Sequence, residues 1–288
     1  MSDEVYLNGE MVPRAEARIS PFDRGFLYGD GLFETVRIVN GVPFRLCRHL
    51  ERMNRSCATL GWGRQLDPEK LRAATEALIE RNAVADGYLR ITASRGPFEG
   101  KLTDLEAASP TVLIDAHAMD LPPLDSPPDY VLARSPYRAE PTSPVVRHKT
   151  LSYQAYLLAL AEARAKGADD VYFVNSGGHL TEGATVNLFF VRAGAVCTPD
   201  EGCGLLPGVT REAVMELCEA QGTPVRPGEF TPEELIQAEE AFCTNSLRGV
   251  VRMSRLLGPP DTEFGRSPVT AALRAAYAAL VDAECRRE

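Results

Sequence analysis

Four prolines fall within the ten residues Met119–Pro128, which read MDLPPLDSPP. Proline fixes the backbone angle φ and has no N–H to donate, so such a segment joins neither a helix nor the middle of a sheet. We therefore predict a stiff, extended linker over residues 119–128. This linker divides the chain into a small N-terminal α/β domain, residues 1–118, and a larger C-terminal domain, residues 129–288.

Both parts mix helical and strand patterns without strict alternation, which predicts an α+β fold rather than a doubly wound sheet. Asn40-Gly41 marks a hairpin because both residues tolerate positive φ. Apolar residues at helical spacing then predict a helix over 46–61, and Asp67-Pro68 marks the start of another. In the second part, the same signals predict helices over 152–166, 210–221, 232–239 and 267–286, and strands over 171–175 and 186–192.

Composition excludes several classes of partner. The 288 residues include 31 Lys+Arg and 40 Asp+Glu, a net charge of −9, whereas nucleic-acid binding needs a basic surface. No apolar run approaches the roughly 20 residues that span a bilayer, and the acidic N-terminus does not resemble a signal peptide. Seven scattered cysteines without a CxxC pair, beside four histidines, indicate free thiols and no metal cluster. We therefore expect a soluble, cytoplasmic protein.

Lys149 is the first candidate for chemistry. It is one of four lysines in the chain, and it comes just before a predicted helix that Ser152 would cap. The positive end of the helix dipole and the neighbouring Arg147 would lower its pKa, and a neutral amine is what attack on a carbonyl requires. A solvated surface lysine is the alternative interpretation of this position.

Further motifs predict charged sites. The run from Leu206 to Thr210 leads into a helix whose first N–H groups would suit an anion. Arg48, Arg52 and Arg55 would form a basic ridge opposite the apolar stripe of their helix, although a solvated helix face is the alternative. Glu182, at a turn before an apolar strand, would need a cationic partner if it were buried, and a protonated pyridine nitrogen would be one.

Together these motifs resemble the class IV aminotransferases, which are pyridoxal 5′-phosphate (PLP) enzymes of fold type IV. This family includes branched-chain and D-amino-acid aminotransferases, (R)-amine transaminases and 4-amino-4-deoxychorismate lyases. The resemblance extends from about residue 5 to residue 255. It rests on six motifs in order: YGDGLFE at 28–34, HLERM at 49–53, HKTLSY at 148–153, TEGATVNLF at 181–189, LPGVTR at 206–211 and TNSL at 244–247.

The resemblance implies a fold type IV enzyme with PLP in the cleft between its domains, the larger domain binding the cofactor, and a homodimer in which a neighbour's loop covers each site. Lys149 would hold the cofactor as a Schiff base and move the proton, Glu182 would pair with the pyridine nitrogen, and Tyr153 would hydrogen-bond the ring oxygen. The residues implied for the phosphate are Arg52, Val209, Thr210 and Ser246. Those implied for the substrate are Tyr28, Phe33, Arg95 and Leu247.

Two reactions stay open. The stretch after Arg95 lacks the Arg-x-His clamp of the D-amino-acid enzymes, and Asn245-Ser246-Leu247 is more similar to the lyases than to the Gly-Thr-Ala of branched-chain enzymes. We expect an aminotransferase that moves an amino group between an amino acid or amine and a 2-oxo acid. A 4-amino-4-deoxychorismate lyase is the alternative, and a PLP-binding protein without turnover is a minor one. The candidate partners of a substrate carboxylate are Arg90, Arg95, Lys101 and Arg248.

Overall fold

The structure is a computed structural model, and it describes residues 3–97, 100–101, 103 and 109–286. Phe98 and Glu99, which belong to the stretch without an Arg-x-His clamp, lie outside the described residues. The chain divides into two units. Unit 1 comprises Met1–Leu121, His148–Ser152 and Val281–Glu288, and unit 2 comprises Pro122–Arg147 and Tyr153–Leu280.

This division differs from the two continuous domains that we expected. The chain first leaves unit 1 after Leu121, within the proline-rich segment, but His148–Ser152 and the last residues from Val281 belong to unit 1 again. The reason for the first exception is backbone pairing, because Thr150 forms an antiparallel bridge with Leu32. Lys149 therefore belongs to unit 1 and not to the C-terminal part.

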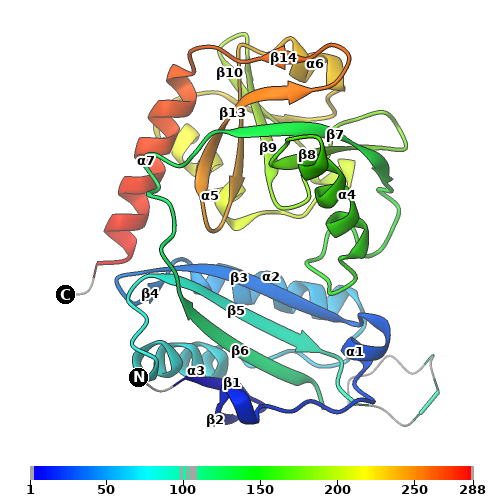
Figure 1. The fold of residues 1–288 in the computed structure, drawn as a ribbon, viewed down its shortest axis with the longest axis vertical. Helices are drawn as coiled ribbons and strands as arrows, with labels where there is room; N and C mark the ends of the chain where they lie inside the picture. Colours follow the sequence, from blue (N-terminus) through cyan, green and yellow to red (C-terminus); the bar gives the residue numbers. More distant parts are fainter. Residues whose placement is uncertain (1–2, 98–99, 102, 104–108, 287–288) are drawn as a thin grey trace. The chain divides into compact units, whose positions relative to one another are not determined.

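Unit 1 is a six-stranded antiparallel sheet in the order β2-β1-β6-β5-β3-β4 (Figure 1). Two helices, α2 and α3, pack their apolar residues against one face of it. The strands are β1 (Glu4–Leu7), β2 (Glu10–Pro13), β3 (Gly31–Val39), β4 (Val42–Pro43), β5 (Gly87–Ser94) and β6 (Thr111–Ala118). The helices are α1 (Arg24–Tyr28), α2 (Leu46–Thr59) and α3 (Pro68–Arg81).

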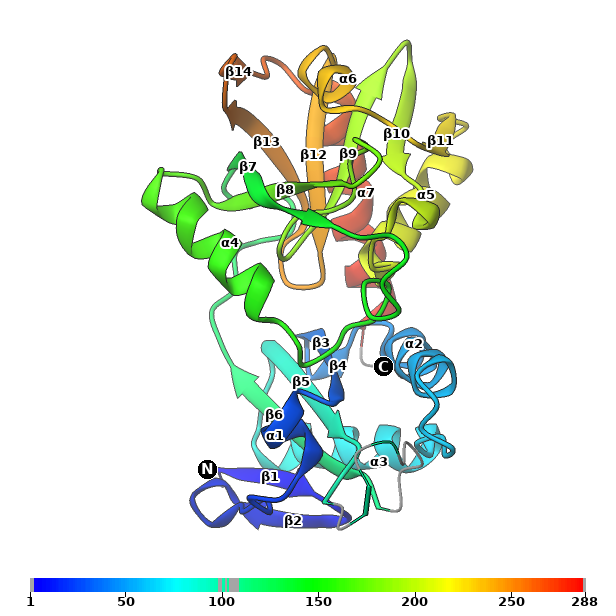
Figure 2. The same cartoon turned by 90° about the vertical axis from the view of Figure 1, so that its right-hand side faces the viewer.

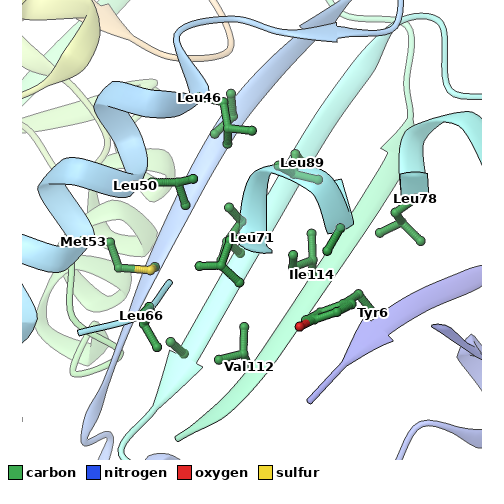
Figure 3. Close-up of a cluster of buried hydrophobic side chains, with 14 of the residues drawn as sticks. Tyr6, Leu46, Leu50, Met53, Leu66, Leu71, Leu78, Leu89, Val112 and Ile114 are labelled. Atoms are coloured by element: carbon green, nitrogen blue, oxygen red, sulfur yellow. The ribbon is translucent and has the colours of Figure 1, made fainter. Parts of the chain in front are cut away.

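Local signals explain these elements. Asn40 and Gly41 have φ of 52° and 74°, as the predicted hairpin turn requires. Asp67 caps α3 by accepting the N–H groups of Glu69 and Lys70, both at 3.1 Å. The apolar stripe of α2 and alternate residues of the strands then form the core of unit 1 (Figure 3). The predicted hairpin and both predicted helices are confirmed.

Unit 2 is an eight-stranded mixed sheet in the order β11-β10-β9-β12-β13-β7-β8, with β14 paired to β13. The helix α4 packs on β7 and β8, and α5 packs on β11 and β12 (Figure 2). The strands are β7 (Tyr130–Ala139), β8 (Asp170–Asn175), β9 (Asn187–Arg192), β10 (Ala195–Pro199), β11 (Val225–Gly228), β12 (Glu240–Asn245), β13 (Gly249–Leu257) and β14 (Thr262–Glu263). The helices are α4 (Gln154–Ala165), α5 (Val209–Ala220), α6 (Pro232–Ile236) and α7 (Pro268–Glu284).

The α+β expectation is confirmed, but one predicted cap is wrong. The helix α4 begins two residues later than predicted, and its N-cap is Tyr153, which makes no side-chain capping bond. The hydroxyl of Ser152 donates instead to the carbonyl of Gly29, at 3.4 Å, because Ser152 follows the segment paired with β3. Among the residues that the structure describes, no helix is both long and apolar enough to cross a bilayer.

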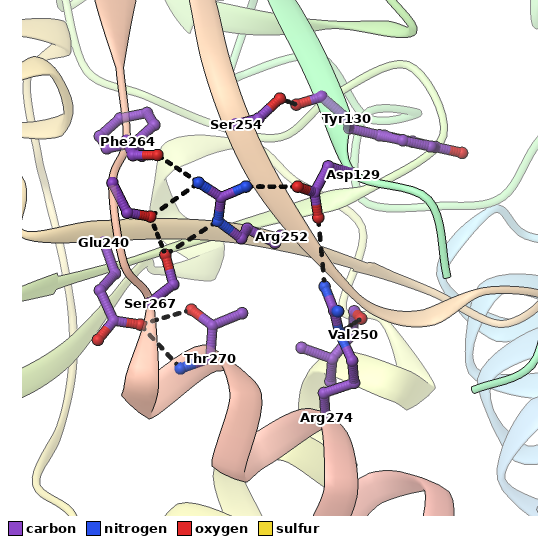
Figure 4. Close-up of polar contacts among 11 residues, drawn as sticks. Asp129, Tyr130, Glu240, Val250, Arg252, Ser254, Phe264, Ser267, Thr270 and Arg274 are labelled. Atoms are coloured by element: carbon purple, nitrogen blue, oxygen red, sulfur yellow. Dashed lines mark hydrogen bonds and ion pairs between the residues drawn. The ribbon is translucent and has the colours of Figure 1, made fainter. Parts of the chain in front are cut away.

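A polar cluster attaches α7 to the sheet of unit 2 (Figure 4). Glu240, the buried first residue of β12, accepts the N–H of Val269 at 3.0 Å and the N–H and hydroxyl of Thr270 at 2.8 Å. It therefore acts as the cap of α7 from a distant strand. Beside it, Arg252 donates to the Ser267 hydroxyl at 3.2 Å and pairs with Asp129.

Replacing Glu240 should destabilise unit 2, because three donors, two of them on the buried Thr270, would lose their acceptor. We expect Glu240→Ala to lower the free energy of unfolding by about 2–3 kcal/mol, measured by urea denaturation at pH 7. Glu219→Ala, at an exposed position of α5, is the control and should change it by less than about 0.5 kcal/mol. Equal stabilities of the two variants would contradict the capping role.

Candidate active site

Lys149 is held by the edge of β3. The N–H of Phe33 donates to the carbonyl of Lys149 at 2.8 Å, and the N–H of Leu151 donates to the carbonyl of Gly31 at 2.9 Å. These bonds lie on either side of the lysine, so its backbone is fixed on a strand rather than in a loop. Its side chain is half-buried. Lys149 is therefore not a fully exposed surface lysine.

The ammonium group of Lys149 lies over an aromatic ring. Its Nζ is 4.5 Å from the ring centroid of Phe33, and the guanidinium carbon of Arg90 is 3.9 Å from the same centroid. Phe33 is buried, and its ring gives both cations an apolar contact surface. Lys149, Phe33 and Arg90 therefore form one cluster of unit 1.

Glu34, the next residue of β3, points to the opposite face and holds α2. Its Oε2 accepts from Arg52 Nη2 at 2.5 Å and from His49 Nδ1 at 2.8 Å, and its Oε1 accepts from Arg52 Nε at 2.9 Å. All three side chains are buried. Burial alone raises the pKa of Glu34, but Arg52 and His49 outweigh it and lower that pKa to about 2. The carboxylate is therefore ionised, and His49 must carry a proton on Nδ1.

The predicted basic ridge of α2 is wrong for its central member. Arg48 and Arg55 are exposed, but Arg52 is 4% exposed and forms an ion pair with Glu34 at 2.5 Å. The reason is that a buried carboxylate requires a buried cation. His148, beside Lys149, reaches the same helix through Ser56, whose Oγ is 2.9 Å from its Nδ1.

Arg95 is hydrogen-bonded inside unit 1. Its Nε donates to Asp30 at 2.9 Å, and its Nη atoms donate to the carbonyls of Gly61 and Leu60 at 3.0 and 3.1 Å. Asp30 also pairs with Arg24 at 2.8 Å. Because Arg95 is only 5% exposed and links the end of α2 to the turn after α1, we assign it a structural role.

The predicted substrate residues Tyr28 and Leu247, and Ser246, which was predicted for the phosphate, lie in different surroundings. Tyr28, the last residue of α1, is 57% exposed. In unit 2, Ser246 and Leu247 are half-buried in the turn between β12 and β13. Asn245 shapes this turn, since its Oδ1 accepts the N–H of Leu247 at 3.1 Å and that of Arg248 at 2.8 Å.

Glu182 is a buried carboxylate of unit 2, and its partners include three neutral donors. Its Oε2 accepts from Asn187 Nδ2 at 3.3 Å and from the N–H of Leu206 at 3.1 Å. Its Oε1 accepts from the hydroxyl of Tyr156 at 3.4 Å. A carboxylate in this setting is suited to a charge-assisted bond with a protonated ring nitrogen.

Two tyrosines of the α4 region stack beside Glu182, with ring centroids 4.9 Å apart. Tyr153 donates its hydroxyl to the carbonyl of Ala184. The second, Tyr156, was not predicted, although its spacing of three residues from Tyr153 on one helix face is a usable signal. Burial, together with the charge of Glu182, raises the pKa of Tyr156, so its phenol stays protonated and able to donate.

The turn that carries Glu182 is built around Asp170, which sequence reasoning also missed. This fully buried carboxylate accepts from the N–H groups of Ala184 at 2.8 Å and Thr185 at 3.1 Å, and from the Thr185 hydroxyl at 2.5 Å. A Cβ at Gly183 would lie 2.7 Å from the carbonyl of Val171, so only glycine fits there. The bonds of Asp170 and the small space at Gly183 therefore fix the backbone conformation of this turn.

The helix α5 begins at Val209, and its first two residues, Val209 and Thr210, are buried. Its N-cap, Gly208, supplies no side-chain hydrogen bond, so the first N–H groups of the helix are suited to an anionic ligand. Arg211 turns away from this end, because its guanidinium donates to the hydroxyl of Thr198 at 3.3 Å and the carbonyl of Pro199 at 3.0 Å.

The sequence of the chain matches a known family. Residues 31–256 match the family described as amino-transferase class IV, and the chain belongs to it. The predicted family is therefore confirmed, and the chain is an enzyme for which aminotransferase is the best-supported activity.

The relatives include proteins named as aminotransferases and proteins named as lyases. A Methanocaldococcus jannaschii protein named provisionally as a branched-chain-amino-acid aminotransferase is 30% identical over 258 residues, covering 88% of both chains. An aminodeoxychorismate lyase of Bacillus subtilis is 28% identical, covering 88% of this chain and 86% of the relative. The crystal structure of the Escherichia coli branched-chain amino acid aminotransferase superposes with a TM-score of 0.89 at 26% identity, covering 100% of this chain and 97% of that one. The predicted fold type is confirmed.

The ion pair of Glu34 should make stability depend on acid pH. Because the folded pKa of Glu34 is about 2, below its ordinary value of 4.5, its contribution is complete above pH 4.5 and is lost as pH falls towards 2. We expect Glu34→Gln to be less stable than wild type at pH 7, with a smaller difference at pH 3, measured by urea unfolding. A difference that does not change with pH would contradict this interpretation.

Proposed function

We propose that this protein is a PLP-dependent aminotransferase, in which Lys149 bonds to the cofactor and moves the proton of the substrate. The observation that carries the proposal is the placement of Lys149. Its backbone is pinned to β3 on both sides, and its amine lies half-buried on the ring of Phe33. A lysine held this way is positioned for chemistry rather than for solvation.

The donor sets of the chain suit this cofactor. When bound, PLP supplies an aldehyde that condenses with amines and a ring that withdraws electrons from the neighbouring carbon. Glu182 would hold the ring nitrogen in its protonated form. The phosphate would be held by the first N–H groups of α5, at Val209 and Thr210, by Ser246 and by Arg52. Tyr153 would hydrogen-bond the ring oxygen.

Arg52 can serve two anions, because a guanidinium has five N–H groups that point in different directions. In the structure, Glu34 accepts from its Nε and Nη2. This ion pair would keep the guanidinium in a fixed orientation towards a phosphate. Lys149 Nζ would accept the substrate proton and return it, while Phe33 keeps water from the amine.

Among the candidate partners for a substrate carboxylate, we propose Arg90. It stands on β5, half-buried, with its guanidinium over the same Phe33 ring as Lys149. Arg95 is occupied within unit 1, and Lys101 is exposed. Arg248 lies in unit 2, and its guanidinium carbon is 5.5 Å from the ring centroid of Tyr130.

The second candidate function is a 4-amino-4-deoxychorismate lyase, which would release pyruvate and 4-aminobenzoate. The turn built by Asn245 favours it, because an Asn-Ser-Leu sequence there resembles the lyases, and a lyase is among the relatives. Both reactions begin with removal of a substrate proton. The residues around Lys149 and Glu182 are therefore compatible with either.

Lys149→Ala should remove activity by a factor of at least about 10³, because no other group would supply the amine at this position. Borohydride reduction of the wild-type protein with PLP, followed by peptide mapping, should locate the cofactor on Lys149. Lys166→Ala, which changes an exposed lysine at the end of α4, is the matched control and should retain activity. Attachment to another lysine would contradict the assignment.

A half-reaction separates the two functions. The protein is given an amino donor (an L- or D-amino acid or an (R)-amine) and no 2-oxo acid. An aminotransferase should then convert its cofactor to pyridoxamine 5′-phosphate, and the conversion is measured as a loss of visible absorption. Release of pyruvate and 4-aminobenzoate from aminodeoxychorismate, without any amino acceptor, would instead establish the lyase.

We also propose a homodimer. Five large apolar residues of unit 1 are about half or more exposed within one short segment: Ile19, Phe22, Phe26, Leu27 and Tyr28. A dense apolar segment of this kind is typical of a protein interface. A loop from a neighbouring copy that covers each site, as the family resemblance implies, would give this segment its partner.

Phe26→Asp should therefore weaken the dimer, because it places a charge in the apolar segment. We expect wild type to be dimeric at micromolar concentration and the variant to shift towards monomer, measured by size-exclusion chromatography with light scattering. Phe26→Leu keeps the position apolar and should remain dimeric. A monomeric wild type would contradict the proposal.

A reducing cytoplasm suits the protein. All seven cysteines are free, and six of them are buried. Together with the net charge of −9, this supports a small-molecule enzyme without a nucleic-acid or membrane partner.

A further inference from the structure

Asn187, the first residue of β9, connects two parts of unit 2 that the proposed function assigns to different ends of one ligand. Its Nδ2 donates to Glu182 Oε2 at 3.3 Å and to the carbonyl of Leu206 at 2.9 Å. The N–H of Leu206 donates to the same oxygen of Glu182, at 3.1 Å. These three residues form a closed set of hydrogen bonds between Glu182 and the turn that leads into α5.

The acceptors determine which way the Asn187 amide points. Both are oxygens, so Nδ2 must face them, and Oδ1 is left facing Gly208. A Cβ at Gly208 would lie 2.0 Å from this Oδ1, although the φ of −72° suits any residue. Glycine is therefore required by the close approach of Asn187 and not by the backbone conformation. The N-cap of α5 packs directly against the amide.

Asn187 is itself held rigidly. Its backbone pairs with Thr244 of β12 and forms a bridge with Glu182, and its side chain is buried. A side chain locked on a central strand can keep two loops at one separation. The amide thus works as a spacer between the Glu182 carboxylate and the first turn of α5.

We propose that Asn187 is a positioning residue that sets the separation between Glu182 and the start of α5, so that one rigid ligand contacts both. The inference rests on the proposed function, in which Glu182 holds the ring nitrogen of PLP and α5 binds its phosphate. Ring and phosphate are joined covalently, so each contact strengthens the other only while the separation matches the ligand.

The experiment compares PLP with pyridoxal, which lacks the phosphate. Cofactor-free protein is titrated with each ligand, and binding is followed by visible absorbance. Asn187→Ala removes both hydrogen bonds that Nδ2 donates, to Glu182 and to Leu206. We expect the Kd of this variant for PLP to rise about tenfold or more. The ratio of the Kd for pyridoxal to the Kd for PLP should fall, because the phosphate no longer reinforces the ring contact.

Asn82→Ala is the matched control. The Asn82 amide also makes two hydrogen bonds, with the N–H and carbonyl of Glu4 in unit 1. This variant should leave both Kd values and their ratio at the wild-type level. Asn187→Asp keeps the volume of the side chain, and it replaces Asn187→Ala if circular dichroism shows that the alanine variant does not fold.

A mutant cycle separates positioning from a general loss of structure. If Asn187 acts through Glu182, Asn187→Ala should weaken PLP binding by a smaller factor in a Glu182→Gln background than in wild type. Equal factors in the two backgrounds would overturn the proposal.

The outcomes also separate this inference from the proposed function. Wild-type Kd values and an unchanged ratio in Asn187→Ala would overturn the positioning role and leave the proposed function standing. A wild-type protein that binds neither PLP nor pyridoxal would overturn both.

Discussion

A carboxylate can be buried in a protein only where donors surround it, and five such carboxylates organise the described part of this chain. Asp23 accepts from the start of α1 and from the distant hydroxyls of Ser94 and Thr111, and Glu34 accepts from α2. In unit 2, Asp170 fixes a turn, Glu182 binds the approach to α5, and Glu240 caps α7. In each case, the charge selects partners that are distant in sequence. The arrangement of helices on both sheets therefore depends on these acidic residues as well as on apolar burial.

Sequence signals predicted the elements whose causes are local. Asn40-Gly41 and Asp67-Pro68 determine a turn and a cap within a few residues, so they could be identified without tertiary information. The strand β7 was missed, because it contains Pro136 and shows no alternation of apolar and polar residues, and its sheet position is set by its neighbours. The pairing of His148–Ser152 with β3 was also invisible, since it joins residues more than a hundred positions apart.

The candidate site shows the same limit. Motifs identified Lys149 and Glu182 as residues, but they could not reveal the Phe33 ring under the amine or the donors around the carboxylate. The hydrogen-bond partners of Arg95 could not be predicted for a related reason. An arginine that follows a strand has the same local pattern whether it faces a ligand or bonds to Asp30, and only the fold decides which. The partner of a charged side chain depends on residues that are distant in sequence, and a local motif does not contain them.

The placement of Lys149 also bears on how such an enzyme can diverge. The chain passes between its two units after residues 121, 147, 152 and 280, so the lysine sits in a five-residue return to unit 1. Genetic exchange of the first 121 residues would carry β3 but leave behind the pentapeptide that pairs with it. Neither unit is one continuous segment, so exchange of a single stretch of sequence would not transfer a whole unit.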